Sequence, residues 1–433
     1  MQALGVVAHG VAMAPSPPSA TTVALLRREP QHLRAVVALG CFSIAEHAAW
    51  VTFLVVAFER GGVREAGIVS AALLVPAAVV APLVAKEVSG RLRLGRPLAA
   101  GYGLQLAALF VTMGVAESDA APVLFYMAAA LVTVATVFSR PVHHAVLAGA
   151  APDVKVAANV ATGLVSGLAQ LVGPLAASLL LLRFTTVAVL GLSTALLAVA
   201  TLATLDIRMP DWHAADSDDA SSWPPRRPAM RHALRADGGG GGGAMVVVFS
   251  VLGLMTVVLG VVETLATKQG DGLIGEGGAG TGALIAGAGG GLLAGASLAG
   301  VMLRRWSERA TMRLGTLVTG AALVLCTRSG GPVWSIAAFV TVGAGMQIVL
   351  VAGWVRLHRH IRPSHACLVF GLLEAQQLLG NAAGSAAAGL AMSVAGSWVI
   401  VALSVVVLSL ATALLGRPDA AHVAVTPARS TSV

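Results

Sequence analysis

Three acidic residues lie inside long apolar stretches of the sequence, where few residue types can do chemistry. They are Glu46, Glu263 and Glu374. An ionised carboxylate in the middle of a bilayer costs about 2.5–3.5 kcal/mol on insertion scales, so such a residue usually faces an aqueous path and binds protons or cations. We therefore predict proton or cation coupling at these positions. The alternative is that the carboxyl groups are protonated and hydrogen-bonded to neighbouring helices.

Glu374 opens a stripe of polar residues along its predicted helix. Gln377, Asn381 and Ser385 follow it three, seven and eleven positions later, which places all four on one helix face. A similar stripe occurs in an earlier predicted helix, and the two suggest the walls of a hydrated pathway, although interhelical hydrogen bonding alone would also explain them. We predict that six residues bind the solute: Trp50, Asn159, Ser166, Gln170, Gln377 and Asn381.

Small residues repeat at a spacing that suits close helix packing. Gly287, Gly291 and Gly295 form a small-xxx-small ladder, and Gly173-Pro174 lies in the earlier polar helix. No strand precedes the ladder, so we interpret it as packing and not as a phosphate-binding loop.

Metal, cofactor and enzyme chemistry lack support in the sequence. The zinc-hydrolase, nucleophile-elbow and phosphate-loop motifs are missing, so we predict no enzyme and no cofactor. Solvation at the membrane interface explains several histidines better than metal binding, and we predict no metal site: His143, His144, His358, His360 and His365. The basic residues fall in short clusters between apolar runs, which argues against nucleic acid as a partner.

The elements that must position these residues are membrane-spanning helices. Of the 433 residues 57% are hydrophobic and only 11% charged, whereas about a quarter of a soluble domain is charged. We predict an all-α membrane protein with twelve transmembrane helices in two pseudo-symmetric six-helix bundles. The expected segments are an N-terminal tail, a first bundle, a linker, a second bundle and a C-terminal tail: 1–32, 33–206, 207–243, 244–416 and 417–433.

The charge distribution gives this arrangement a direction. With the N-terminus in the cytoplasm, 23 of the 28 Lys and Arg residues lie on the cytoplasmic side, as the positive-inside rule requires. We therefore expect a multi-pass protein of the plasma or inner membrane, monomeric in the lipid bilayer, with both termini in the cytoplasm.

Short interspan motifs resemble a known family. Residues of two predicted loops, after the second and after the eighth span, match the tail of a conserved loop: Arg93, Gly95 and Arg96, then Gly300, Arg304 and Arg305. The loop G-x-x-x-D-R-x-G-R-R/K is typical of the major facilitator superfamily of twelve-helix secondary transporters, where it moves with the conformational change. Here Leu92 stands where that family has its acid.

A second resemblance narrows the expected function. The segment around Gly173-Pro174 is similar to the antiporter element of that family, and Arg140-Pro141, Pro152 and Ala158-Asn159 are similar to the pattern of drug, macrolide and siderophore exporters. Proton-coupled exporters also carry an arginine within the fourth span. Our predicted fourth span, Ala121 to Phe138, has none.

Together these features predict a secondary active transporter that exports a small amphipathic organic solute in exchange for protons, by alternating access. An uptake symporter on the same fold is the first alternative. A membrane sensor or scaffold that does not transport is the second, because Leu92 replaces the loop acid.

Overall fold

The computed structural model describes residues 30–88, 95–118, 121–148, 152–205, 207, 241–271, 273–274, 278–327, 331–360, 366–396 and 398–416. These residues are almost entirely helical, and no strand occurs among them. The all-α membrane fold predicted from the apolar runs is therefore confirmed. Arg93 and His365 lie outside the described residues, and so do the side chains of Arg96, His143, His144, Asn159, His358 and His360.

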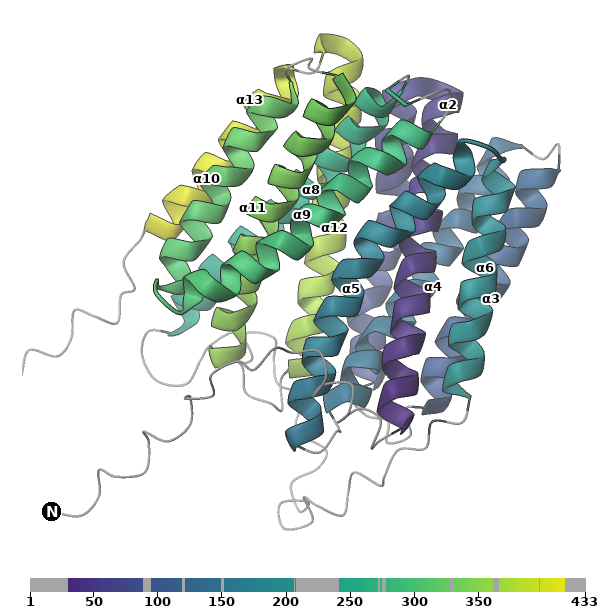
Figure 1. Ribbon diagram of the computed structural model, residues 1–433, viewed down its shortest axis with the longest axis horizontal. Helices are drawn as coiled ribbons and strands as arrows, with labels where there is room; N and C mark the ends of the chain where they lie inside the picture. The colour runs from purple at the N-terminus through teal and green to yellow at the C-terminus, as the bar shows by residue number, and fades with distance from the viewer. Residues whose placement is uncertain are drawn as a thin grey trace, which may run out of the picture.

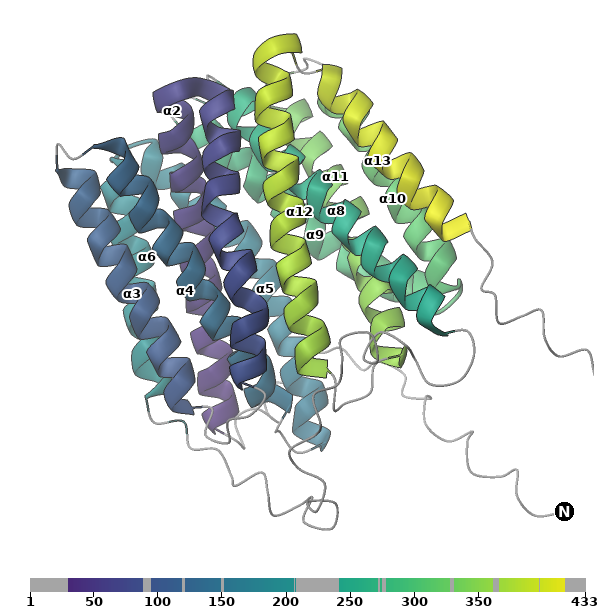
Figure 2. The ribbon, with the colours of Figure 1, turned by 180° about the vertical axis from the view of Figure 1, so that it is seen from behind.

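The first helix contains two segments joined by a tight turn. Helix α2 runs over Pro30–Val88, and its helical geometry breaks at Gly61 and Gly62. Gly62 has a φ of 65°, a left-handed backbone conformation that a residue with a Cβ rarely adopts. The chain turns back there (Figure 2). We call the membrane side that holds this turn the turn side, and the side that holds Pro30 the opposite side.

Ten further helices complete the described fold (Figure 1). They are α3 (Gly95–Glu117), α4 (Pro122–Ala148), α5 (Pro152–Leu181), α6 (Thr186–Thr204), α8 (Gly241–Gly270), α9 (Ala279–Leu303), α10 (Glu308–Cys326), α11 (Gly331–His360), α12 (Ala366–Ala395) and α13 (Trp398–Gly416).

Each half of the chain buries its own apolar core. Phe42, Tyr102 and Leu190 belong to a cluster formed by α2, α3, α4 and α6. Met255 and Phe339 belong to another, formed by helices from α8 to α13. Burial of these side chains away from lipid and water makes two groups of helices that lie side by side (Figure 1). We call helices α2 to α6 the first bundle and helices α8 to α13 the second bundle.

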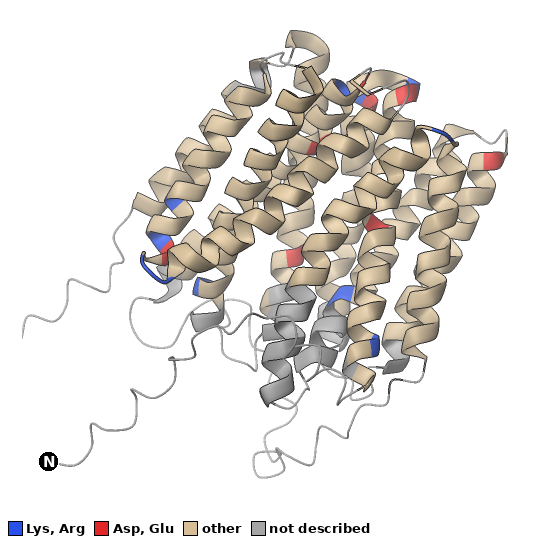
Figure 3. Cartoon of the chain, viewed as in Figure 1, with Lys and Arg blue, Asp and Glu red and all other residues tan. Residues whose placement is uncertain are grey.

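Nine of the helices in the described part of the chain are long and apolar enough to cross a membrane, and one of these is the two-segment α2. Helix α10 carries three charged residues in its 19, which keeps it out of this group. The predicted total of twelve spans therefore stays a prediction. Charged residues gather near the two ends of the helices, with few in the middle (Figure 3).

Glycines bring the two bundles into backbone contact. Helix α2 packs along α12, and α5 packs along α9. A Cβ on Gly67 would collide with the carbonyl oxygen of Ser385, and one on Gly289 would collide with that of Gln170. Contacts this close between helices of different bundles fix how the polar residues of α2 and α12 face each other.

Candidate functional site

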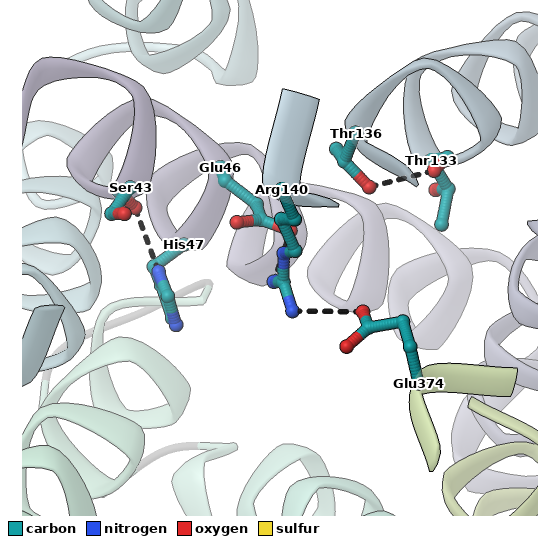
Figure 4. A network of polar contacts seen from close by, with 7 residues as sticks. All are labelled: Ser43, Glu46, His47, Thr133, Thr136, Arg140 and Glu374. Atoms are coloured by element: carbon teal, nitrogen blue, oxygen red, sulfur yellow. Dashed lines mark hydrogen bonds and ion pairs between the residues drawn. The ribbon is translucent and has the colours of Figure 1, made fainter. Parts of the chain in front are cut away.

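A single arginine joins two of the intramembrane carboxylates (Figure 4). Arg140 of α4 donates from Nη2 to Oε1 of Glu46 at 2.7 Å, and from Nη1 to Oε1 of Glu374 at 3.1 Å. Arg140 and Glu46 belong to the first bundle, whereas Glu374 belongs to α12 of the second. The guanidinium therefore forms one ion pair within a bundle and one across the two bundles.

The charges of this triad do not balance. Two carboxylates and one guanidinium carry a net charge of −1 when all are ionised, so the site can accept one further positive charge, as a proton or a cation. The groups are only partly exposed, at 38% of the Arg140 side chain and 20% of the Glu374 side chain. An ionisable cluster within membrane helices is the arrangement found along proton and solute pathways.

Arg140 is the residue that sequence reasoning placed wrongly. We expected the fourth span to end at Phe138 and to lack an arginine, but α4 continues to Ala148 and its apolar span includes Arg140. A charge normally marks the end of a span, yet a guanidinium paired with two carboxylates can stay within the helix. Glu46 and Glu374 each require a cationic partner within the membrane, and this requirement could have pointed to Arg140.

Three neighbouring polar side chains hydrogen-bond within their own helices. His47 lies beside Glu46 but its Nδ1 is 2.7 Å from the carbonyl oxygen of Ser43, on another face of α2 (Figure 4). Thr133 and Thr136 donate to backbone carbonyls of α4. The hydrogen bonds of these three side chains therefore go to the backbone of their own helices.

The third carboxylate forms a separate polar site. Asn381 of α12 donates from Nδ2 to Oε2 of Glu263 on α8, at 3.3 Å. Ser385 donates to Oδ1 of Asn381 and to the carbonyl oxygen of Gly260, both at 3.2 Å. The indole N–H of Trp50, on α2, lies near the Glu263 carboxylate, and it is buried with no hydrogen bond of normal geometry to any described residue.

The polar stripe of α12 therefore connects two sites. Glu374 contacts the arginine of the first bundle, and Asn381, about two turns along the helix, contacts Glu263. Gln377 lies between them and is partly buried. The predicted stripe on α5 includes Ser166 and Gln170, and both are partly buried. The backbone of Gln170 packs against Gly289.

The predicted packing glycines lie at helix contacts. Gly291 and Gly295 abut the backbone carbonyls of Val340 and Ala344 on α11, and Gly287 faces Ile336. Gly173 approaches α2 at Ile44 and His47, while the Pro174 carbonyl faces Gly282 of α9.

The described residues of the predicted loops lie at or near helix ends. Gly95 and Arg96 begin α3, and Arg304 and Arg305 are exposed just after α9. A Cβ on Gly300 would meet no atom within 4 Å. Among the residues that the structure describes, no three His, Cys, Asp or Glu side chains gather as metal ligands would.

Comparison with known proteins gives a family and several structural relatives. The model of the Major Facilitator Superfamily matches residues 35–366. No curated protein matches the sequence. The nucleoside transporter NupG superposes with a TM-score of 0.65 at 15% identity, over 90% of this chain and 100% of that one. The human organic anion transporter TETRAN gives 0.64 at 16%, over 89% and 99%.

A third similar structure is the peptide transporter POT in complex with sulfate, with a TM-score of 0.65 at 12% identity, over 89% of this chain and 92% of that chain. At these identities the likeness shows the shared fold.

Proposed function

Because the chain belongs to the major facilitator superfamily of membrane transporters, we propose that it exports a small amphipathic organic solute in exchange for protons. The solute would cross by alternating access between the two bundles. The observation that carries the proposal is the ion pair of Arg140 with Glu374, which joins the bundles at a site that is one positive charge short of neutrality.

Protonation of Glu374 would loosen the contact between the bundles. A hydrogen bond between two charged groups is roughly twice as strong as one between neutral groups, so a neutral Glu374 holds Arg140 less tightly. Glu46 keeps the guanidinium in the first bundle through its shorter ion pair of 2.7 Å. Proton binding thereby separates α12 from α4 on the opposite side, and proton release draws them together.

The two carboxylates thus have different roles in the proposed cycle. Glu374 is the coupling group because its partner lies in the other bundle. Glu46 positions Arg140 and keeps the guanidinium paired when Glu374 is neutral, which avoids an uncompensated charge within the membrane.

The proposed direction is outward across the plasma or inner membrane. Support comes from the positive-inside count, which puts the opposite side and both termini in the cytoplasm, and from the exporter-like residues Arg140-Pro141. Protons would enter down their gradient while solute leaves.

Purified protein in liposomes tests this function. A panel of fluorescent amphipathic dyes, ethidium among them, is loaded inside or outside, and a pH gradient is imposed in either direction. We expect gradient-driven dye flux against the proton flow. Flux in the same direction as protons would indicate the uptake symporter, and no flux of any dye under either gradient would contradict transport.

A further inference from the structure

Building on the proposed transport function, we propose that the solute is an organic cation and that its positive charge binds at Glu263, between α2, α8 and α12. The triad around Arg140 then handles the proton, and Glu263 handles the solute. Five features support this division: the partners of Glu263, the charge of the interior, the helices that meet there, the partial exposure of Glu263, and the neighbouring Trp50.

Glu263 has only neutral partners among the described residues. Asn381 donates an amide hydrogen to it, and Ser385 in turn donates to Asn381. The next basic residue along α8, Lys268, donates instead to the carbonyl oxygen of Met392, at 3.5 Å. A carboxylate within the membrane that lacks a cationic partner is costly, so it requires a proton or a bound cation.

Arg140 does not provide that cation. Its guanidinium is already shared by Glu46 and Glu374. The two polar sites therefore carry three carboxylates and one guanidinium, an imbalance that attracts cations and repels anions. A solute with a negative charge would meet a second negative charge at either site.

Glu263 also lies where a solute must pass. It belongs to the second bundle, whereas Trp50 comes from α2 of the first, so a ligand between them would contact both bundles, as alternating access requires. Glu263 is only partly buried, so the residue is not fully enclosed by the packed helices.

An organic cation needs a negative charge and an apolar surface, and Trp50 supplies the apolar surface beside Glu263. An indole ring offers apolar surface and attracts cations through its π face. Within the described residues its buried N–H makes no hydrogen bond of normal geometry, but it lies close to the Glu263 carboxylate, so a small shift would let it donate to that carboxylate and orient it. A carboxylate beside a tryptophan is the combination that binds ammonium and phosphonium groups.

Equilibrium binding to purified protein in detergent tests the inference without any gradient. The probes are tritiated tetraphenylphosphonium and its anionic counterpart of similar shape, tetraphenylborate. We expect wild-type protein to bind the cation and not the anion. Glu263→Gln should weaken binding of the cation by about tenfold or more, as expected when a hydrogen-bonding group loses its charge.

Matched variants separate charge from fold. Glu263→Asp keeps the charge and should retain most of the binding, whereas Glu117→Gln removes a carboxylate that is exposed at the end of α3 and should change nothing. A carbodiimide label on Glu263, followed by mass spectrometry of wild-type protein, needs no variant. Saturating tetraphenylphosphonium should protect Glu263 from the label.

Three results would overturn the inference: equal binding by wild type and Glu263→Gln, equal binding of the cation and the anion, or labelling of Glu263 that the cation leaves unchanged. Because these measurements use no gradient, they are independent of proton coupling. Cation binding at Glu263 without gradient-driven flux would contradict the transport function alone.

Discussion

Replacing Glu374 by Gln should shift the equilibrium between the two bundle arrangements. The variant keeps a hydrogen-bond acceptor near Nη1 of Arg140 but removes the charge from the 3.1 Å ion pair that joins the bundles. Breaking a fully buried pair costs about 3–5 kcal/mol, whereas an exposed pair is worth about 0–1 kcal/mol. This pair is partly exposed, at 38% and 20% of the two side chains, so we expect about 1–2 kcal/mol after screening.

A change of that size alters a two-state population by a factor of about 5 to 30. Spin labels on Val37 of α2 and Val301 of α9, both exposed and on the opposite side, would report the separation of the bundles by pulsed electron resonance. We expect the longer distance to gain population in Glu374→Gln, and acid to produce the same shift in the parent protein. Glu117→Gln is the control. Identical distance distributions in Glu374→Gln and the parent would refute the role of this ion pair as a latch.

Further variants test other parts of the structure. Arg140→Lys should strongly reduce dye flux, because one ammonium cannot present the planar fork that reaches both carboxylates; flux at the parent rate would count against the triad. Glu46→Gln should also reduce flux by releasing Arg140, and unchanged export would remove Glu46 from the cycle. Gly289→Ala should lower thermal stability by about 1–3 kcal/mol through overpacking, because its Cβ would meet the backbone of Gln170. Gly300→Ala should leave thermal stability unchanged, because a Cβ at that position would meet open space. Equal melting temperatures of the two variants would show that α5 and α9 can move apart freely.

The helices could be predicted from the sequence because a chain segment in lipid must satisfy its own backbone hydrogen bonds. Lipid leaves no partner for a free backbone group, so a long apolar run can only be a helix. The apolar segment that begins at Met312 is short, so it was the least certain of the twelve predicted spans. The structure places it in α10, whose first turns carry Glu308, Arg309 and Arg313. A span with charges near one end dilutes the average hydropathy on which such predictions depend.

The candidate site was predictable only in part, because a single helix pattern does not show which side chains meet across helices. Glu46, Glu263 and Glu374 were visible as charges in apolar runs. Their arrangement was not: two of them share Arg140, and the third pairs with Asn381. Those contacts arise from the packing of α2, α4, α8 and α12.

Proton movement during solute export tests the central proposal most directly. Liposomes that contain the protein, a pH-sensitive dye and tetraphenylphosphonium would report the internal pH while the cation leaves. We predict that protons move opposite to the cation in the parent protein and that Glu374→Gln abolishes this coupled movement. Cation flux without proton movement in the parent, or equal proton movement in Glu374→Gln, would contradict exchange through the Arg140 triad.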